Sequence, residues 1–156
     1  MTELEKTIAA LKEKNLSIAL AESCSGGYAS YLLTKTPGSS KVFKGSIVVY
    51  SLKMKTKLFG IPLSKLEKTQ GVSKEISLIL AQKVRNKFKS DLGASIVGFA
   101  GPSTRKDVKV GTVYISLCDK KSIISKRSLL TGPRNMVQKK AGNILINMIY
   151  EKIKTY

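Results

Sequence analysis

The chain has 156 residues, a formal net charge of +18 at pH 7, two cysteines and no histidine. The length fits one domain with a core of its own. The lack of histidine excludes Ser-His-Asp triads, Cys-His pairs and histidine metal sites, and two cysteines are too few for a disulfide framework or a thiolate zinc site. Because the ten acidic residues do not cluster as metal ligands would, we expect neither a metal nor an organic cofactor.

The positive charge comes mainly from lysine. Of the 28 basic residues, four are arginines and 24 are lysines, and the lysines are scattered over every segment without a block of five or six. Proteins that read bases rely on the planar guanidinium group of arginine. The pattern therefore predicts solvated surface lysines and, at most, weak, salt-sensitive and non-specific attraction to nucleic acid.

The N-terminal segment predicts a surface helix. Leu4, Ile8 and Leu11 recur at helical spacing, which indicates a helix from about Leu4 to Lys14. This segment is charged and amphipathic, unlike the apolar region of a signal peptide. No run in the chain is long and apolar enough to span a bilayer. We therefore expect a cytoplasmic protein with no membrane partner.

The stretch from Ser17 to Leu33 predicts a strand, a glycine-rich turn at Glu22–Gly27 and a helix. A strand that passes directly into a helix leaves unpaired N–H groups for an anionic group, and glycines allow close backbone approach. Two hydroxyls and a thiol also lie in this turn. The pattern fits a functional site, but it also fits a structural turn in which Ser23 caps the helix. The helix should bury three apolar residues, Ala29, Leu32 and Leu33.

The middle of the chain continues this alternation. Residues 36–40 predict a turn, the β-branched run at 46–51 predicts a strand after Gly45, and residues 53–60 predict a short helix that ends before Pro62. Ser73 should cap a long helix. The apolar face of that helix would comprise Ile76, Leu80, Val84 and Phe88.

The last third predicts three strands and a helix. Residues 94–99 form a buried apolar run, and a polar loop separates it from residues 111–118 and 122–130, which should pair antiparallel. A final helix is expected from about Asn135 to Lys152. Its apolar residues would be Val137, Ala141, Ile144, Leu145 and Met148. Helices that alternate with apolar strands predict a three-layer α/β/α sandwich with a mixed, mostly parallel sheet, in one domain over residues 1–156.

Seven separated strings resemble one known family. They are AESCSGG at Ala21–Gly27, PGSS at Pro37–Ser40, YSLKMK at Tyr50–Lys55, GVSKE at Gly71–Glu75, GFAGP at Gly98–Pro102, VGTVYISL at Val110–Leu117 and TGPRN at Thr131–Asn135. In this order they are similar to the CinA C-terminal domain family, which includes the PncC-type nicotinamide mononucleotide amidohydrolases. The resemblance runs from about residue 5 to residue 152.

The resemblance implies a deamidase that converts nicotinamide mononucleotide to nicotinate mononucleotide and ammonia in pyridine-nucleotide salvage. Ser23 matches the family's nucleophile, Tyr50 and Lys55 match the residues that activate it, and Arg134 matches an arginine near the last helix. The resemblance also assigns the pocket walls to Ser25, Gly26, Gly27, Gly98, Ala100 and Gly101. The expected partners are a small nucleotide substrate and further copies of the chain, as a dimer or a larger homo-oligomer.

These roles agree with the chemistry of amide hydrolysis. Without histidine, a lysine can act as the base only if burial or neighbouring cations lower its pKa toward neutrality. Lys55 would then accept the proton of Ser23, with Tyr50 relaying the proton or orienting the amine. Arg134 would hold the phosphate through charge-assisted hydrogen bonds.

Each assignment has a structural alternative. Tyr50 could be a buried strand aromatic, Lys55 one solvated lysine among many, and Arg134 a residue that only flanks the last helix. The sequence also departs from the family pattern at Leu52, in the loop at 103–109 and at Pro133. Three functions stay open: the amidohydrolase, a catalytically silent or regulatory nucleotide-binding member, and a basic, competence-linked protein associated with nucleic acid.

Overall fold

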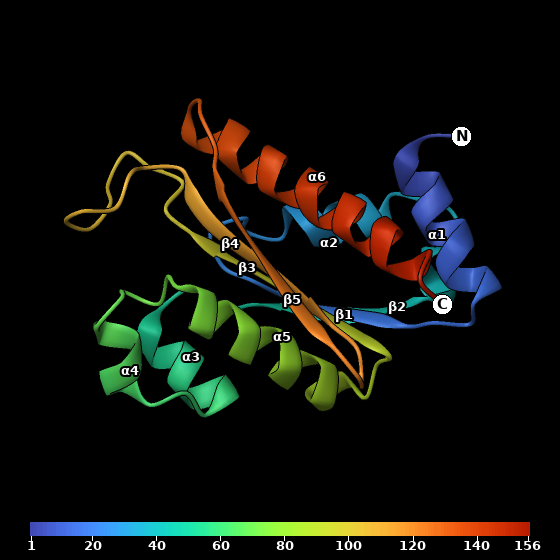
Figure 1. Ribbon diagram of the computed structural model, residues 1–156, viewed down its shortest axis with the longest axis horizontal. Helices are drawn as coiled ribbons and strands as arrows, with labels where there is room; N and C mark the ends of the chain where they lie inside the picture. Colours follow the sequence, from blue (N-terminus) through green and yellow to red (C-terminus); the bar gives the residue numbers. More distant parts are fainter.

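The computed structural model describes all residues 1–156 and contains one five-stranded mixed sheet (Figure 1). The strands are β1 (Ile18–Glu22), β2 (Phe43–Val48), β3 (Leu92–Gly98), β4 (Thr112–Cys118) and β5 (Ile123–Leu129). Across the sheet they follow the order β2-β1-β3-β4-β5. Strand β1 pairs parallel with β2 and β3, whereas β4 is antiparallel to β3 and β5. Because only β4 is reversed, the predicted mixed, mostly parallel sheet is confirmed.

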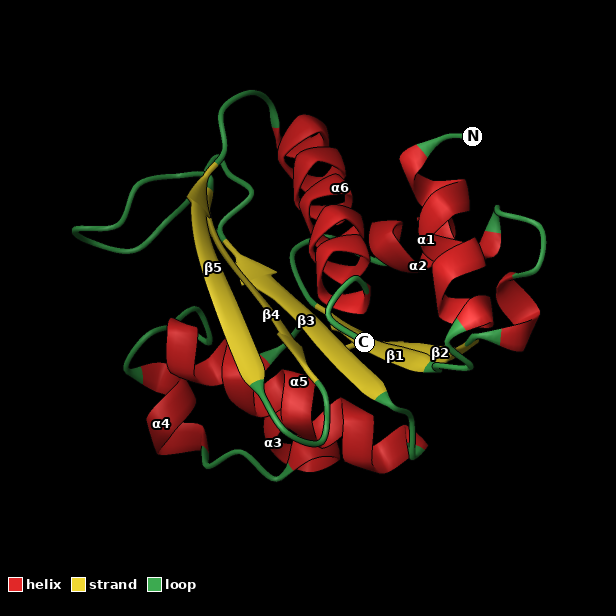
Figure 2. Cartoon of the chain, turned by 45° about the vertical axis from the view of Figure 1, so that its right-hand side comes forward, coloured by secondary structure: helices red, strands yellow, loops and turns green.

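Helices cover both faces of the sheet, which confirms the predicted three layers (Figures 1 and 2). One face carries α1 (Glu3–Glu13), α2 (Tyr28–Thr34) and α6 (Arg134–Ile153). The other carries α3 (Leu52–Phe59), α4 (Leu63–Glu67) and α5 (Lys74–Phe88). None of the helices combines the length and the apolar character that crossing a bilayer requires.

The core has two parts because successive side chains of a strand point to opposite faces. In β1, Ile18 and Leu20 pack in the larger apolar cluster beneath α1, α2 and α6, whereas Ala19 and Ala21 pack in the smaller cluster beside α3, α4 and α5. The small side chains on the second face allow α5 to lie close to the sheet. At Gly93 of β3, an added Cβ atom would lie 2.3 Å from a main-chain oxygen of α5.

The structure moves both ends of β2 and adds the short helix α4 to the predicted elements. Strand β2 begins at Phe43 and ends at Val48, rather than spanning 46–51, because a register shift before Gly45 lets the earlier residues pair with β1. Ser51 leaves the sheet and caps α3 by accepting a hydrogen bond from the Met54 N–H. The five-residue helix α4 was not predicted, whereas Ser73 caps α5 as expected.

The topology places the ends of three parallel strands at one edge of the sheet. Ser23 follows β1, Tyr50 lies just after β2, and Phe99 follows β3. Because carboxyl ends of parallel strands meet at the same edge, segments far apart in the sequence come together there. The first turn of α6, which begins at Arg134, reaches the same edge. This edge is where a ligand is expected in an open α/β sheet.

Candidate active site

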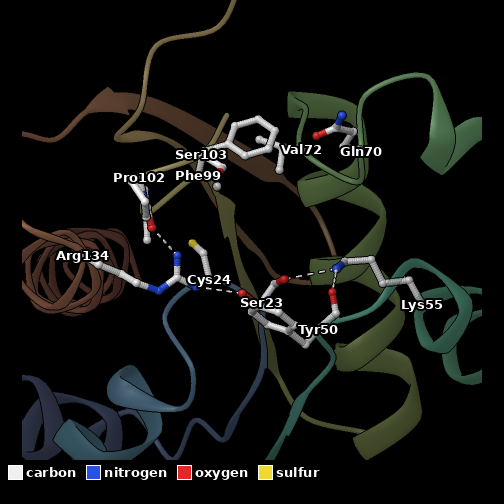
Figure 3. Close-up of a pocket in the computed structure, with 13 residues that line it drawn as sticks. Ser23, Cys24, Tyr50, Lys55, Gln70, Val72, Phe99, Pro102, Ser103 and Arg134 are labelled. Atoms are coloured by element: carbon white, nitrogen blue, oxygen red, sulfur yellow. Dashed lines mark hydrogen bonds between the residues drawn. The ribbon is translucent and has the colours of Figure 1, made fainter. Parts of the chain in front are cut away.

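A cavity of about 280 Å³ lies at this edge of the sheet (Figure 3). Seven of the ten residues predicted from the sequence line it: Ser23, Tyr50, Lys55, Gly98, Ala100, Gly101 and Arg134. The rest of the lining is formed by Cys24, Gln70, Val72, Phe99, Pro102 and Ser103. None of the lining residues is acidic, so the charge of the cavity wall comes from Lys55 and Arg134 alone.

Lys55 and Ser23 are in direct contact, although 32 positions separate them in the sequence. The Lys55 amine donates a hydrogen bond of 3.1 Å to the Ser23 hydroxyl and one of 3.0 Å to the Tyr50 carbonyl (Figure 3). Lys55 is only 2% exposed and Ser23 only 8%. Lys55 is therefore not a solvated surface lysine. The Ser51 cap begins α3 one turn earlier, which places Lys55 on the inner side of that helix.

The environment of Lys55 lowers the pKa of its amine, so that it holds its proton less tightly than an ordinary lysine. No carboxylate lies within ion-pair distance of its amine, and burial lowers its pKa from 10.5 to about 8. Desolvation disfavours the charged ammonium, because the apolar surroundings cannot replace its hydration. At pH 7 the Lys55 amine is then neutral in roughly a tenth of the molecules. A neutral amine in contact with a serine hydroxyl can accept its proton.

The thiol of Cys24 is a poor candidate for the nucleophile, although it lines the same cavity. Burial raises the pKa of Cys24 to about 12, which outweighs the opposite effect of the nearby Lys55. The reactive form of cysteine is the thiolate, and here the thiol stays protonated at neutral pH. The hydroxyl of Ser23 is thus the nucleophile that the local geometry favours.

Tyr50 contacts Lys55 through its main chain and Arg134 through its side chain. Its carbonyl accepts a hydrogen bond from Lys55, while its hydroxyl accepts one of 2.8 Å from the Arg134 guanidinium (Figure 3). Arg134 also donates to the Gly101 carbonyl. Tyr50 is 62% exposed and so is not a buried strand aromatic. The carbonyl orients the amine, whereas the hydroxyl does not lie between Lys55 and Ser23 in the position that a proton relay requires.

The buried carboxylate of Glu22, which is not among the predicted site residues, organises the turn after β1. It accepts hydrogen bonds from the hydroxyls of Ser25 and Ser30 and from the N–H groups of Ala29 and Ser30. These N–H groups belong to the first turn of α2, so Glu22 does the work of a helix cap. An acidic residue at the end of an otherwise apolar strand was a usable signal, because a buried carboxylate needs several donors.

This network corrects the predicted pocket walls. Ser25 is 3% exposed and directs its hydroxyl to Glu22, so it does not line the cavity. Gly26 and Gly27 also lie outside the lining; both have positive φ, and Gly27 stands at the N-cap position of α2. They shape the turn rather than the cavity wall. Ser23 does not cap α2 either, so its hydroxyl is available for the contact with Lys55.

The turn also presents main-chain N–H groups beside Ser23. The N–H of Ser23 donates to the Ile96 carbonyl of β3, whereas those of Cys24 and Ser25 have no main-chain acceptor. Gln138 of α6 holds the turn by donating a hydrogen bond of 2.9 Å to the Cys24 carbonyl. Unpaired N–H groups next to a nucleophile can stabilise the oxyanion of an acyl-transfer intermediate. No group of three or more histidine, cysteine or acidic side chains in the structure could hold a metal ion.

Comparisons with known proteins agree on one family. The sequence model of the CinA C-terminal domain matches residues 1–153. The CinA-like protein of Cytophaga hutchinsonii is 36% identical over 153 residues, which are 97% of this chain and 37% of that protein. The CinA-like protein of Prochlorococcus marinus is 40% identical over 143 residues, 89% of this chain and 33% of that protein. The chain thus spans about a third of the length of these relatives.

Solved structures of the same superfamily have the same fold. A competence-damaged protein (CinA) superfamily protein from Klebsiella pneumoniae superposes with a TM-score of 0.93 at 21% identity, over 99% of this chain and 97% of that chain. One from Enterobacter cloacae gives a TM-score of 0.91 at 25% identity, over 97% of this chain and 90% of that chain.

Proposed function

The chain belongs to the CinA C-terminal domain family, and we propose that it is an amidohydrolase that converts nicotinamide mononucleotide to nicotinate mononucleotide and ammonia. The observation that carries this proposal is the contact between Ser23 and the buried amine of Lys55. An amide is a poor electrophile, so its hydrolysis needs an activated nucleophile. A buried lysine with a pKa of about 8 supplies the base in a chain that has no histidine.

The proposed reaction proceeds through an acyl-enzyme. Neutral Lys55 takes the proton of Ser23 as the serine oxygen attacks the carboxamide carbon. The N–H group of Cys24, which lines the cavity beside Ser23, stabilises the oxyanion. The intermediate then collapses, the C–N bond breaks, and the leaving nitrogen receives the proton from Lys55 and departs as ammonia. Water, deprotonated by Lys55, hydrolyses the ester to nicotinate mononucleotide and restores Ser23.

The cavity suits a small anionic substrate. Its volume of about 280 Å³ lies just below the usual range for small-molecule sites, roughly 300–1,000 Å³, which favours a mononucleotide over a dinucleotide. Arg134 would bind the phosphate. A guanidinium has five N–H donors, and contacts with Tyr50 and Gly101 use only part of them. Arg134 also begins the 20-residue helix α6, whose first turn has no acidic residue and no side-chain cap, so the helix dipole favours an anion there.

The decisive experiment is a coupled assay of ammonia release by the purified chain. We expect turnover of nicotinamide mononucleotide, less efficient turnover of the dephosphorylated riboside, and no turnover by Ser23→Ala. Full activity should survive exhaustive chelation. A wild-type protein that binds the mononucleotide but releases no ammonia would instead be the silent member of the family. Steep salt-dependent DNA binding with a sequence preference, together with no nucleotide binding, would favour the nucleic-acid function.

A further inference from the structure

Gln70 has a backbone conformation that glycine usually occupies. It lies in the turn that ends α4, with a φ of +53°. There the Gly71 N–H donates to the Leu66 carbonyl and the Gln70 N–H to the Glu67 carbonyl, the pattern of a left-handed helix end. Such an end favours glycine, because a side chain crowds the backbone at positive φ. The chain therefore carries a side chain here at a cost in stability.

The Gln70 side chain is free to contact a ligand. It is exposed, lines the cavity and makes no hydrogen bond within the chain. Figure 3 shows it on the same side of the cavity as Val72, across from Arg134. Strained residues that persist at ligand sites often do so because their side chains are needed there. The amide of glutamine offers both donors and an acceptor without charge.

We infer that Gln70 determines specificity by hydrogen-bonding the sugar hydroxyls of the substrate. This inference rests on the proposed function. The carboxamide must lie at Ser23 to react, and the phosphate is best held by the cation Arg134. The remaining polar groups of a mononucleotide are uncharged hydroxyls, which an uncharged amide matches in both donor and acceptor character. Val72 and the Phe99 ring provide apolar surface beside it, as in most small-molecule sites.

Lys89 provides a matched control. It is also a non-glycine residue in the left-handed conformation at the end of a helix, with a φ of +51° after α5. Its side chain is exposed and does not line the cavity. Replacement by glycine should relieve the same backbone strain at both positions, but only Gln70 should affect the substrate.

The test compares Gln70→Gly, Gln70→Ala and Lys89→Gly. We expect both glycine variants to raise Tm by about 2–4 °C. Only the two Gln70 variants should raise KM for nicotinamide mononucleotide, by about three- to tenfold, the equivalent of one lost hydrogen bond, with kcat unchanged. With the 2′,3′-dideoxy analogue as substrate, wild type and Gln70 variants should have the same KM.

Two results would overturn the inference: a wild-type KM in Gln70→Gly, or an equal rise in KM for the dideoxy analogue. Failure of the proposed function is a separate outcome, seen as absence of ammonia from every nicotinamide compound in the wild type. Calorimetric binding of nicotinamide mononucleotide then decides the role of Gln70. The inference is supported if only the Gln70 variants bind nicotinamide mononucleotide more weakly than the wild type and if they bind the dideoxy analogue as the wild type does. It is contradicted if the Gln70 variants bind the mononucleotide as tightly as the wild type, or if the wild type does not bind it.

Discussion

Replacing Lys55 by methionine should abolish most of the hydrolysis and yet make the folded protein more stable at pH 7. The pKa of Lys55 is about 8 instead of 10.5, so the protonated amine destabilises the native state by about 3 kcal/mol. Methionine removes this penalty at similar volume. It also removes the hydrogen bonds to Ser23 and Tyr50, each worth about 1 kcal/mol. The net gain is about 1–2 kcal/mol, or an increase in Tm of about 2–8 °C.

The pH dependence of unfolding gives the sharper test of this reasoning. Since the pKa of Lys55 is lower in the folded state, the unfolded chain binds one more proton between pH 8 and pH 10.5. The free energy of unfolding of the wild type should therefore rise with pH through this window, by about 1.4 kcal/mol per pH unit from Lys55. Below pH 8 the destabilisation by the protonated Lys55 amine should be fully present. Lys55→Met should lack this rise. The rate of hydrolysis should likewise increase through about pH 8 in the wild type, as the amine becomes neutral.

Denaturant unfolding at several pH values between 7 and 10.5, together with ammonia release, measures both effects. Lys53→Met is the matched control, because Lys53 is an exposed lysine on the same helix. It should leave activity and the pH dependence unchanged. If Lys55→Met is less stable than the wild type at pH 7, or if the two stability curves stay parallel above pH 8, the Lys55 amine is not desolvated and the proposed base is wrong.

Three further predictions concern the other residues of the site. Ser23→Ala should abolish most activity with little change in Tm. Combining it with Lys55→Met should reduce the activity little further, because the effects of groups that act on one step are not additive. The control Ser25→Ala should lower Tm, because it removes one donor from the buried Glu22 carboxylate, but should keep the activity. Arg134→Ala should raise KM for nicotinamide mononucleotide far more than for the riboside; equal losses would make Arg134 structural. Cys24→Ala should retain most activity, and complete loss would point to a thiolate mechanism.

The fold was predictable where the periodicity was strong. Continuous apolar strands and helices with one apolar face were identified because burial imposes those patterns. The exceptions have local causes. The start of β2 at Phe43 depends on a register shift before Gly45, which no periodicity reports. Helix α4 has only five residues and follows Pro62, so it is too short to show a repeating apolar face.

The lining of the candidate site was predictable from the sequence for seven of the ten assigned residues, but the orientation of their side chains was not. The resemblance to a family predicted that Ser23 and Lys55 lie together, and a lysine base was expected to need either burial or neighbouring cations. Which atoms of Tyr50 face Lys55 depends on the hydroxyl contact with Arg134, 84 positions away, and no local pattern encodes it. Ser25 was assigned to the cavity because the sequence does not reveal the hydrogen bond that its hydroxyl donates to the buried Glu22 carboxylate.

The two buried charged groups beside the cavity, Glu22 and Lys55, differ in how completely they are hydrogen-bonded. The carboxylate of Glu22 is 0% exposed and accepts four hydrogen bonds, whereas the Lys55 amine, with three N–H bonds to give, makes two. Changing a fully hydrogen-bonded buried charge leaves its donors without an acceptor and costs stability, whereas neutralising a partly hydrogen-bonded one removes a desolvation penalty. Glu22→Gln should therefore act in the opposite direction to Lys55→Met.

The Glu22→Gln substitution would replace one carboxylate oxygen by an NH₂ group, which would then face the N–H donors of α2. At least one of the N–H groups of Ala29 and Ser30 would then lose its acceptor. We expect Glu22→Gln to lower the free energy of unfolding by about 2–3 kcal/mol, or Tm by roughly 5–10 °C. Thermal unfolding followed by circular dichroism measures this loss, with Glu67→Gln as the control, because Glu67 of α4 is an exposed carboxylate. A Glu22→Gln variant as stable as the wild type would show that the number of hydrogen bonds to a buried charge does not predict the effect of neutralising it.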